Sequence, residues 1–271
     1  MGELDEAAVE EAMGRAPDEL MALLADLTSA TDARLRDLAK RLAAQLCLEV
    51  GRREPARPRG ASNLASLPFT PEGGDLDLDS SLDAITEAVG ARAAVDVDRL
   101  RVRAWSKPTT GFCLLVDRSG SMGGAPLATS AVAAAAVAWR SPQDYSVLAF
   151  AKDVVVTKSQ DLYKSSEQVV ADVLALRGSG TTDLAGALLV AQIQLLRSRA
   201  RRRITVLLSD CRATVDGDVA AAAAALEELV IIAPEGDSVE AAKLASRVGA
   251  RIATVSGPSA VAAAFQSLLG R

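Results

Sequence analysis

The amino-acid sequence predicts an α/β fold: a doubly wound, mostly parallel sheet with one antiparallel edge strand, preceded by a small helical N-terminal region. The first observation is that short apolar segments alternate with longer helical segments from residue 111 onward, which is typical of parallel strands covered on both faces. The second is a composition of 49% hydrophobic but only 3% aromatic residues, which indicates a packed, helix-rich globular protein. With 271 residues, the chain is long enough for one sizeable α/β domain and a smaller appended region.

The predicted strands are short, and most are apolar throughout. They are Phe112–Val116, Ser146–Phe150, Asp153–Thr157, Arg203–Ser209, Glu228–Ile232 and Arg251–Val255. Asp153–Thr157 is predicted to be the hairpin partner of Ser146–Phe150 and therefore the antiparallel edge. Helices are predicted at about residues 126–139, 165–177, 183–200, 216–226, 238–248 and 259–269. In such folds, ligands bind at the carboxyl ends of the strands.

The first 75 residues divide into two parts. Residues 1–50 are predicted to be helical, because four leucines recur at helical spacing between Leu35 and Leu46. A helical hairpin that packs on the main domain and a separate partner-docking module both fit this pattern. Residues 51–75 are rich in Pro, Gly and Arg and are predicted to be a linker.

Residues 76–108 are predicted to form a helix followed by a strand. The helix is expected to begin near Ser80 or Ser81, and apolar and charged residues alternate after it from Leu100 to Trp105. Such alternation is typical of a half-exposed strand, which we expect to lead into the main sheet. The main domain is then predicted to span residues 109–271.

Several absences exclude classes of function. The chain has no histidine, which rules out Ser-His-Asp and Cys-His catalysis and every histidine-containing zinc site. Its three cysteines lack CxxC spacing and fit a reducing cytosol better than a disulfide framework. The acidic N-terminus does not resemble a signal peptide, and the alanine-rich run 131–139 is too short to cross a bilayer. A net charge of −5 disfavours nucleic acid as the main partner. From the cysteines, the N-terminus and the length of the apolar run, we expect a soluble cytoplasmic protein without membrane association.

Three segments carry oxygen-bearing side chains to the expected ligand-binding edge of the sheet. Asp117, Ser119 and Ser121 occupy alternate positions directly after the first strand, in a loop whose glycines permit sharp turns. Thr182 lies in a glycine-rich loop that opens a helix, and Asp210 ends the apolar strand ITVLLSD. Because the carboxyl ends of parallel strands meet at one edge, we expect these side chains to converge.

This donor set suits a magnesium ion. Mg²⁺ prefers near-octahedral oxygen ligation, keeps several waters and usually takes one or two carboxylates. A site with two acids and three neutral hydroxyls leaves the cation able to bind one more anionic oxygen, which an Asp or Glu of another protein can supply. The residues therefore predict a metal-dependent adhesion site with an open face, with Mn²⁺ or Ca²⁺ as alternative ions.

Other interpretations fit parts of the same pattern. The hydroxyl residues are common helix caps, and Asp210 is of a type common in turns. A magnesium-assisted phosphohydrolase with Asp117 as nucleophile is an alternative function, but such an enzyme needs a second carboxylate two residues on, where this chain has Ser119. A structural scaffold with a vestigial metal site is a third. The occurrence of all three segments together favours the metal site, and we expect no enzymatic activity.

The DxSxS loop, the later Thr before an Asp, and the Asp after a third strand resemble a von Willebrand factor A (VWA) domain with its metal-ion-dependent adhesion site. The resemblance covers roughly residues 109–271. By this resemblance the Mg²⁺ ligands are Asp117, Ser119, Ser121, Thr182 and Asp210. Thr182 is preferred to Thr181 because it directly precedes Asp183. The family often has Gly after the last Asp, where this chain has Cys211, a departure that concerns the loop geometry and not the carboxylate.

The segment that runs from residue 76 into the DxSxS loop resembles particular groups of VWA proteins. It is similar to the region preceding the VWA domain of magnesium-chelatase D-type subunits, and to VWA proteins that work beside MoxR-type AAA+ ATPases. Those families imply a non-catalytic partner that couples an ATPase to a client during metal insertion or enzyme maturation. Because the chain has no GxxxxGK[ST] motif, the ATPase is expected in trans, and the client is expected to offer an Asp or Glu carboxylate to the metal.

Arg197–Arg203, RSRARRR, is a concentrated basic run at a predicted helix end. One interpretation is the favourable placement of cations near a helix C-terminus. The other is docking to an acidic surface or to nucleic acid.

Overall fold

The computed structural model describes residues 6–29, 33–52, 63–68, 75–91, 93–106, 110–120, 123–178 and 180–269. The chain forms two compact units. The larger contains residues 1–56 and 109–271, and the smaller contains residues 57–108. The smaller unit is therefore an insertion in the sequence of the larger one.

A six-stranded sheet is the centre of the larger unit. Its strand order is β6-β5-β4-β7-β8-β9. The strands are β4 (Thr110–Asp117), β5 (Tyr145–Phe150), β6 (Val154–Lys158), β7 (Arg202–Leu208), β8 (Leu229–Pro234) and β9 (Arg251–Val255). All neighbouring strands are parallel except β5 and β6. This confirms the predicted doubly wound sheet and its antiparallel edge strand.

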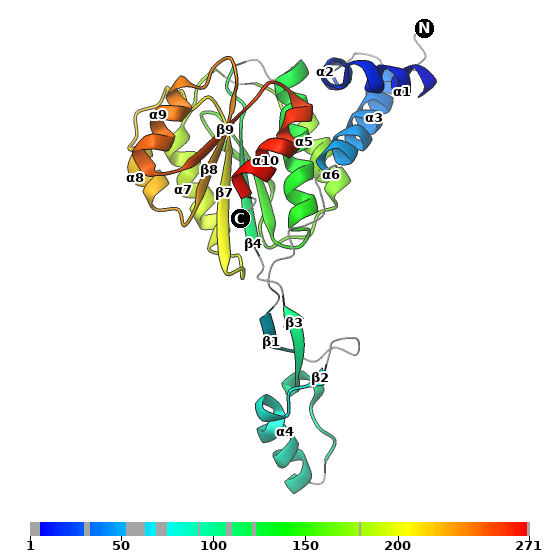
Figure 1. Cartoon of the computed structure of the whole chain (residues 1–271), viewed down its shortest axis with the longest axis vertical. Coiled ribbons are helices and arrows are strands. Elements are labelled where there is room, and N and C mark those ends of the chain that lie inside the picture. Colours follow the sequence, from blue (N-terminus) through cyan, green and yellow to red (C-terminus); the bar gives the residue numbers. More distant parts are fainter. Residues whose placement is uncertain are drawn as a thin grey trace. The chain divides into compact units, whose positions relative to one another are not determined.

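Helices cover both faces of this sheet (Figure 1). One face carries α5 (Gly124–Arg140), α6 (Ser166–Leu174), the 3₁₀ turn η2 (Pro258–Ala260) and α10 (Val261–Leu269). The other carries α7 (Leu184–Leu195), α8 (Val219–Ala224) and α9 (Val239–Val248). The alternation of β4 explains the two cores, because Leu114 and Val116 face the α5 side and Cys113 and Leu115 the α7 side.

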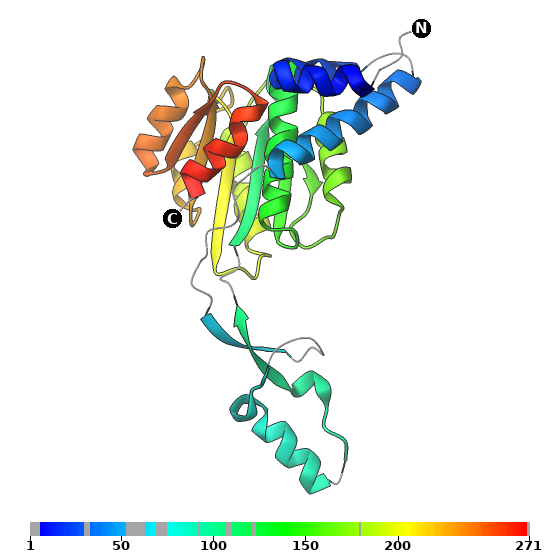
Figure 2. The same ribbon diagram turned by 45° about the vertical axis from the view of Figure 1, so that its right-hand side comes forward.

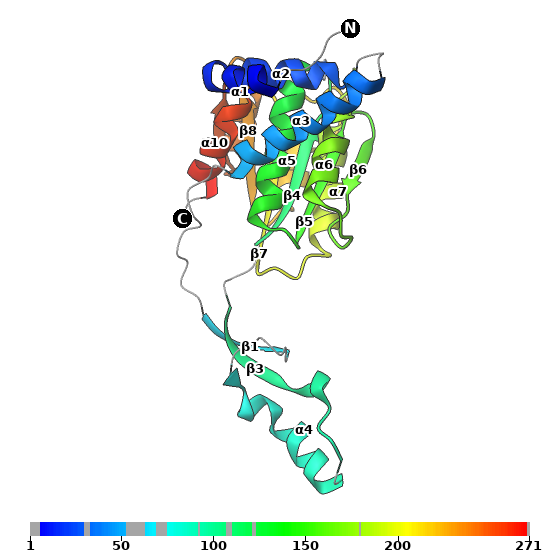
Figure 3. The ribbon, with the colours of Figure 1, turned by 90° about the vertical axis from the view of Figure 1, so that its right-hand side faces the viewer.

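The N-terminal helices pack on the main domain. They are α1 (Glu6–Arg15), α2 (Pro17–Leu27) and α3 (Ala33–Arg52). Helices α2 and α3 lie against α5, and α3 also contacts α6 (Figures 2 and 3). As a result, every residue of α5 from Leu127 to Ala138 is buried, with the sheet on one side and the N-terminal helices on the other. Of the two interpretations of residues 1–50, packing on the main domain is the one observed.

Two carboxylates of α2 fasten it to helix starts of the main domain. Asp26 Oδ1 accepts a 2.6 Å hydrogen bond from the backbone N–H of Gly124, the first residue of α5. Asp18 accepts 2.8 and 3.0 Å bonds from the backbone N–H and the hydroxyl of Ser259 in η2. The first N–H groups of a helix lack intrahelical partners and favour nearby negative charge, so both contacts stabilise the docked position of α2.

The smaller unit is a three-stranded antiparallel sheet with one helix. It contains β1 (Asn63–Pro68), β2 (Asp75–Leu76), α4 (Leu78–Ala91), the 3₁₀ turn η1 (Val97–Arg99) and β3 (Arg101–Ser106), in the order β1-β3-β2. The half-exposed strand predicted after α4 is therefore present as β3, but it pairs with β1 and β2 and not with the main sheet. Within the predicted linker, residues 63–68 form β1, which pairs with β3. This strand was not predicted, because the Pro and Gly residues around it are typical of a linker.

No helix within the described part of the chain is long and apolar enough to cross a membrane.

Candidate metal centre

Asp117 and Ser119 lie together at the carboxyl end of β4. Asp117 is the last residue of the strand and is half-buried. Its Oδ1 accepts a 2.8 Å hydrogen bond from the backbone N–H of Ser119, and its Oδ2 accepts a 2.5 Å bond from the hydroxyl of Ser209. Gly120 follows with a φ of 67°, a left-handed conformation that turns the loop. Ser121, the third predicted ligand of this loop, lies outside the described residues.

Asp210 lies two residues past the end of β7, the parallel neighbour of β4. The pairing of Val116 with Leu208 brings the ends of the two strands side by side. Asp210 is half-buried, and its Oδ1 accepts a 2.9 Å bond from the backbone N–H of Arg212. The two aspartates predicted from separate segments therefore come from adjacent strand ends.

Ser209 is the residue that joins these two loops. Its hydroxyl donates to Asp117, and the same oxygen accepts a 2.8 Å bond from the backbone N–H of Cys211. Ser209 was not predicted from the sequence as a residue of the site. Its position between an apolar strand and an aspartate was the available signal, but its partner depends on the register between β4 and β7.

Thr182 is fixed by its backbone to the loop that follows β7. Its N–H donates to the hydroxyl of Thr214 at 2.7 Å, and its carbonyl accepts from the N–H groups of Thr214 and Val215 at 3.0 and 3.2 Å. The N–H of Asp183 donates to the carbonyl of Ala151, just past β5, at 2.7 Å. Thr182 is only 2% exposed, and its hydroxyl makes no hydrogen bond with the described residues. The exposed Thr181 has no such anchoring.

Asp183 itself caps α7, because its Oδ1 accepts a 2.9 Å bond from the N–H of Gly186. The capping role that could have been given to Thr182 thus belongs to its neighbour. Thr182 is buried, in a loop whose backbone is bonded to the segments that follow β5 and β7. The choice of Thr182 as the metal-binding residue of this loop stays a prediction.

Cys211 occupies the position where the VWA pattern often has glycine, and its backbone conformation explains that preference. Its φ is 63°, and it is the one non-glycine residue with positive φ in the described part of the chain. A residue with a Cβ adopts this conformation only at a cost, whereas glycine adopts it freely. The loop keeps the turn despite the substitution. Burial, together with the nearby Asp210, raises the pKa of the Cys211 thiol to about 12, so the thiol stays protonated at neutral pH and is not an activated nucleophile.

Two arginines lie beside the predicted ligands. Arg118 follows Asp117, and its Nη1 donates a long 3.4 Å bond to the carbonyl of Arg177. Its Nε is buried and has no hydrogen-bond partner among the described residues. Arg212 follows the other aspartate loop and donates to Asp237 Oδ1 at 2.6 Å. The charge of Arg212 is therefore paired with a carboxylate, whereas Arg118 contacts only a backbone carbonyl among the described residues.

The donor chemistry fits a hard, partly hydrated cation. The residues offer carboxylate and hydroxyl oxygens, which suit Mg²⁺, Mn²⁺ and Ca²⁺ and not soft metals. Each carboxylate oxygen of Asp117 accepts one hydrogen bond, which leaves lone pairs for an ion. Over the described residues, no three His, Cys, Asp or Glu side chains form a metal-binding group. A closed structural site is therefore absent from this part of the chain, whereas an open site of two acids and hydroxyls does not require such a group.

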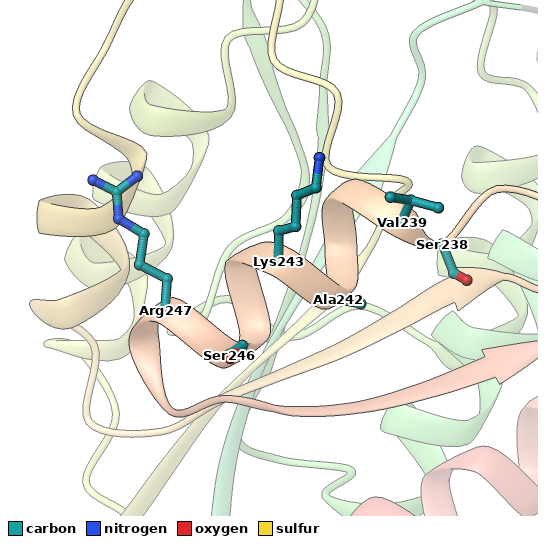
Figure 4. A pocket seen from close by; sticks show the side chains of 6 residues that line it. All are labelled: Ser238, Val239, Ala242, Lys243, Ser246 and Arg247. Atoms are coloured by element: carbon teal, nitrogen blue, oxygen red, sulfur yellow. The ribbon is translucent and has the colours of Figure 1, made fainter.

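A shallow hollow on the outer side of α9 was not predicted from the sequence and shares no residue with these loops (Figure 4). It is lined by Ser238, Val239, Ala242, Lys243, Ser246 and Arg247. Its lysine is already paired with Glu240 on the same helix, at 2.7 Å. The hollow is an open helix face and offers no converging donor set.

A comparison with protein families decides the identity of the chain. Residues 38–268 match the family described as "VWA domain containing CoxE-like protein". The chain belongs to this family. The match includes the whole inserted unit as well as the main domain, so the predicted resemblance to a VWA domain is confirmed. A CoxE-like VWA protein also fits the group of MoxR-associated VWA proteins.

Three solved structures are similar to parts of this CoxE-like VWA protein at low identity. Proximal thread matrix protein 1 from the mussel byssus, with a zinc-occupied MIDAS motif, is 12% identical with a TM-score of 0.49, covering 59% of this chain and 47% of that one. A von Willebrand factor type A protein from Catenulispora acidiphila is 16% identical with a TM-score of 0.45, covering 62% and 43%. An aerotolerance-related membrane protein from Bacteroides fragilis is 14% identical with a TM-score of 0.47, covering 60% and 100%. This chain thus spans less than half of the first two proteins. No curated protein matches it.

Proposed function

We propose that this CoxE-like VWA protein is a metal-dependent protein-interaction module. Its metal ligands are Asp117, Ser119, Ser121, Thr182 and Asp210, and the ion is Mg²⁺, with Mn²⁺ or Ca²⁺ as alternatives. The observation that carries the proposal is the hydrogen-bond network that ties the three loops together, through Ser209 to Asp117 and through Thr214 to Thr182. Loops that are fastened to one another hold donors in place before an ion or a partner arrives.

The residues of the site have separate tasks. Asp117 and Asp210 supply negative charge for a divalent cation, and the hydroxyl groups add neutral oxygen donors. A bound Mg²⁺ ion would act as a Lewis acid that attracts one further anionic oxygen. Arg118, which follows Asp117 and contacts only a backbone carbonyl among the described residues, adds a positive charge that favours the approach of a negatively charged side chain. These features support a client that binds through an exposed Asp or Glu carboxylate.

We further propose that the protein works with a MoxR-type AAA+ ATPase supplied in trans during metal insertion or enzyme maturation. Membership of the CoxE-like family supports this assignment. The chain has no nucleotide-binding GxxxxGK[ST] motif of its own, so it depends on another protein for ATP hydrolysis. In this arrangement the VWA module binds the client, and the ATPase supplies the free energy of ATP hydrolysis.

A hydrolytic function is less well supported. A phosphohydrolase built on Asp117 would need a second acid at position 119, which is a serine, and Cys211 is a protonated thiol without a neighbouring base. Non-catalytic binding requires none of these groups. The third candidate, a scaffold with a vestigial metal site, differs from the proposal only in metal binding and is separated from it by experiment.

The test is a pull-down of the purified MoxR-type ATPase and of its client enzyme by this protein, with Mg²⁺ and with EDTA. We expect EDTA and the Asp117→Ala substitution each to reduce client recovery by at least about tenfold, as expected for loss of one desolvated charge pair. Asp172→Ala, which removes a carboxylate on α6 away from the ligand loops, is the matched control. Client recovery that is unchanged by EDTA would show that the ion does not bridge the complex.

A further inference from the structure

The helix of the inserted unit exposes an apolar stripe. Leu78, Leu82, Ile85 and Val89 on α4 follow the spacing i, i+4, i+7, i+11 and therefore share one face of the helix. Leu78, Leu82 and Val89 are 55–71% exposed. The helix uses a different face, of small residues, to pack on its own sheet. Those buried residues are Ser81, Ala84 and Ala88. The large apolar side chains are thus left without a cover.

The side of α4 next to this stripe is acidic. Asp79, Asp83 and Glu87 recur every four residues, and the helix contains no Lys or Arg. Asp79 and Glu87 pair with Arg103 and Arg99 of the same unit, but the exposed Asp83 carboxylate has no ion pair in the described chain. A surface that combines an apolar stripe with unpaired acid favours a partner that is apolar and basic.

Helix α7 of the main domain has the complementary character. Its sequence, LAGALLVAQIQL, contains no charged residue, and a helix that is apolar all round is normally buried. Helix α5, the equivalent helix on the opposite face, meets that rule because α2 and α3 cover it. On α7, in contrast, Leu189 and Ile193, together with the C-cap residue Leu196, are 48–66% exposed at i, i+4, i+7 spacing.

The basic run that follows α7 supplies the charge. Arg197, Arg202 and Arg203 have acidic or carbonyl partners in the described chain. Arg199 and Arg201 are exposed and make no ion pair or hydrogen bond with the described residues. The stripe on α7 therefore ends beside two unpaired cations, as the stripe on α4 runs beside an unpaired acid.

We propose that α4 of one copy of this protein docks on α7 of a second copy. Antiparallel packing of the two helices places Asp79 and Asp83, in the first turns of α4, beside Arg199 and Arg201, past the C-terminal end of α7. It also sets the positive N-terminal end of one helix dipole against the negative C-terminal end of the other. A contact between two α4 helices would instead bring like charges together, so the charge pattern favours α7 as the occupant.

The contact is heterologous, because it joins two different surfaces. Each copy keeps one free stripe after it has bound one neighbour, so copies add head to tail and form closed rings or open chains. This association is independent of the metal centre. It concerns a surface that the proposed function does not use, and it persists in EDTA.

The test is sedimentation velocity over a range of protein concentrations, with EDTA present. We expect the wild-type protein to form oligomers that weaken at high salt, because part of the attraction is between exposed charges. Leu82→Asp and Ile193→Asp should each weaken self-association by on the order of tenfold or more. Val239→Asp, which changes an exposed apolar residue at the start of α9 (Figure 4), should leave it unchanged. Circular dichroism establishes that each variant is folded.

Mixing the two stripe variants gives the most specific outcome. Leu82→Asp keeps an intact α7 stripe and Ile193→Asp keeps an intact α4 stripe, so an equimolar mixture should form a one-to-one complex that does not grow further. The double charge reversal Arg199→Glu/Arg201→Glu should also weaken association, and adding Asp83→Arg to the same chain should restore part of it. A wild-type protein that stays monomeric at every concentration would overturn the proposal. So would oligomers that survive Ile193→Asp, or a mixture that fails to associate.

Discussion

Residue 211 adopts a left-handed backbone conformation in the loop that carries Asp210, although it is a cysteine. Left-handed backbone costs about 1–2 kcal/mol for a residue with a Cβ. We expect Cys211→Gly to leave the free energy of unfolding within about 1 kcal/mol of wild type, because relief of this cost offsets the lost burial of the thiol. Cys211→Val, whose branched Cβ fits the conformation worst, should lower it by about 2 kcal/mol. Urea unfolding measures both, and equal stability of the two variants would contradict this account of the loop.

Ser209 positions Asp117 without being a predicted ligand itself. Removal of its hydroxyl in Ser209→Ala leaves Asp117 Oδ2 without its donor and the Cys211 N–H without its acceptor. Groups that orient a metal ligand typically affect affinity by about 10–100-fold, so we expect Mg²⁺ affinity to fall by that factor. Ser246→Ala, on the exposed side of α9, is the matched control. Unchanged affinity in Ser209→Ala would show that Asp117 does not depend on this bond.

Candidate ligands could be proposed from the sequence, but the residues that hold them in position could not. Asp117 and Asp210 were identifiable because each follows a buried apolar strand, and parallel strands end at a common edge. Thr182 could be separated from Thr181 only by resemblance, and the structure shows the physical difference: one is buried and anchored to Thr214, the other exposed. The contributions of Ser209 and Thr214 depend on register and loop pairing, which a single sequence does not encode locally.

At the scale of elements, α2 depends on its two aspartates for its docked position. Asp18 and Asp26 act as caps for helices that are remote in sequence. Loss of a capping carboxylate typically costs about 1 kcal/mol, so we expect Asp18→Ala/Asp26→Ala to lower the free energy of local opening of α2 by about 2 kcal/mol. Native-state hydrogen exchange of the α2 amides measures this opening. Glu19→Ala, an exposed neighbour, should leave exchange unchanged, and unaffected α2 protection in the double variant would refute the capping role.

The β5–β6 hairpin contains a buried lysine with a pH-dependent effect. Lys158 Nζ donates to the carbonyls of Tyr145 and Ser159, and burial lowers its pKa from 10.5 to about 8. The unfolded chain therefore holds this proton more tightly, and the free energy of unfolding gains a contribution that rises as pH increases from about 8 to 10.5. The difference between wild type and Lys158→Met isolates this contribution from other groups. If that difference does not change with pH, the lysine keeps its ordinary pKa in the folded protein.

The main strands could be predicted from the sequence, but some helix ends and strand pairings could not. The six main strands were predictable because each is short, apolar and followed by a helix or hairpin. The helix predicted to reach residue 200 ends at Leu195, since the chain then turns and Ser198 bonds to Asp144. Pairing of β1 with β3 was not predictable, because β1 is six residues long and is enclosed by Pro- and Gly-rich sequence.

Taken as a whole, the protein is proposed to carry two independent binding surfaces. The loops at the ends of β4 and β7 form the metal-dependent one, and the stripes on α4 and α7 form the metal-independent one. The family match spans both surfaces. The first is proposed to bind a client, and the second is proposed to bind a further copy of this chain.

The central claim is that the ends of β4 and β7 and the loop before α7 hold a divalent cation. Isothermal titration of Mg²⁺ into the full chain tests it directly, with Mn²⁺ and Ca²⁺ as comparison ions. The account predicts one binding site in the wild-type protein, loss of that site in Asp117→Ala, and its retention in Asp172→Ala. Absence of binding heat for all three ions with the wild-type protein, or equal binding by Asp117→Ala, would contradict it.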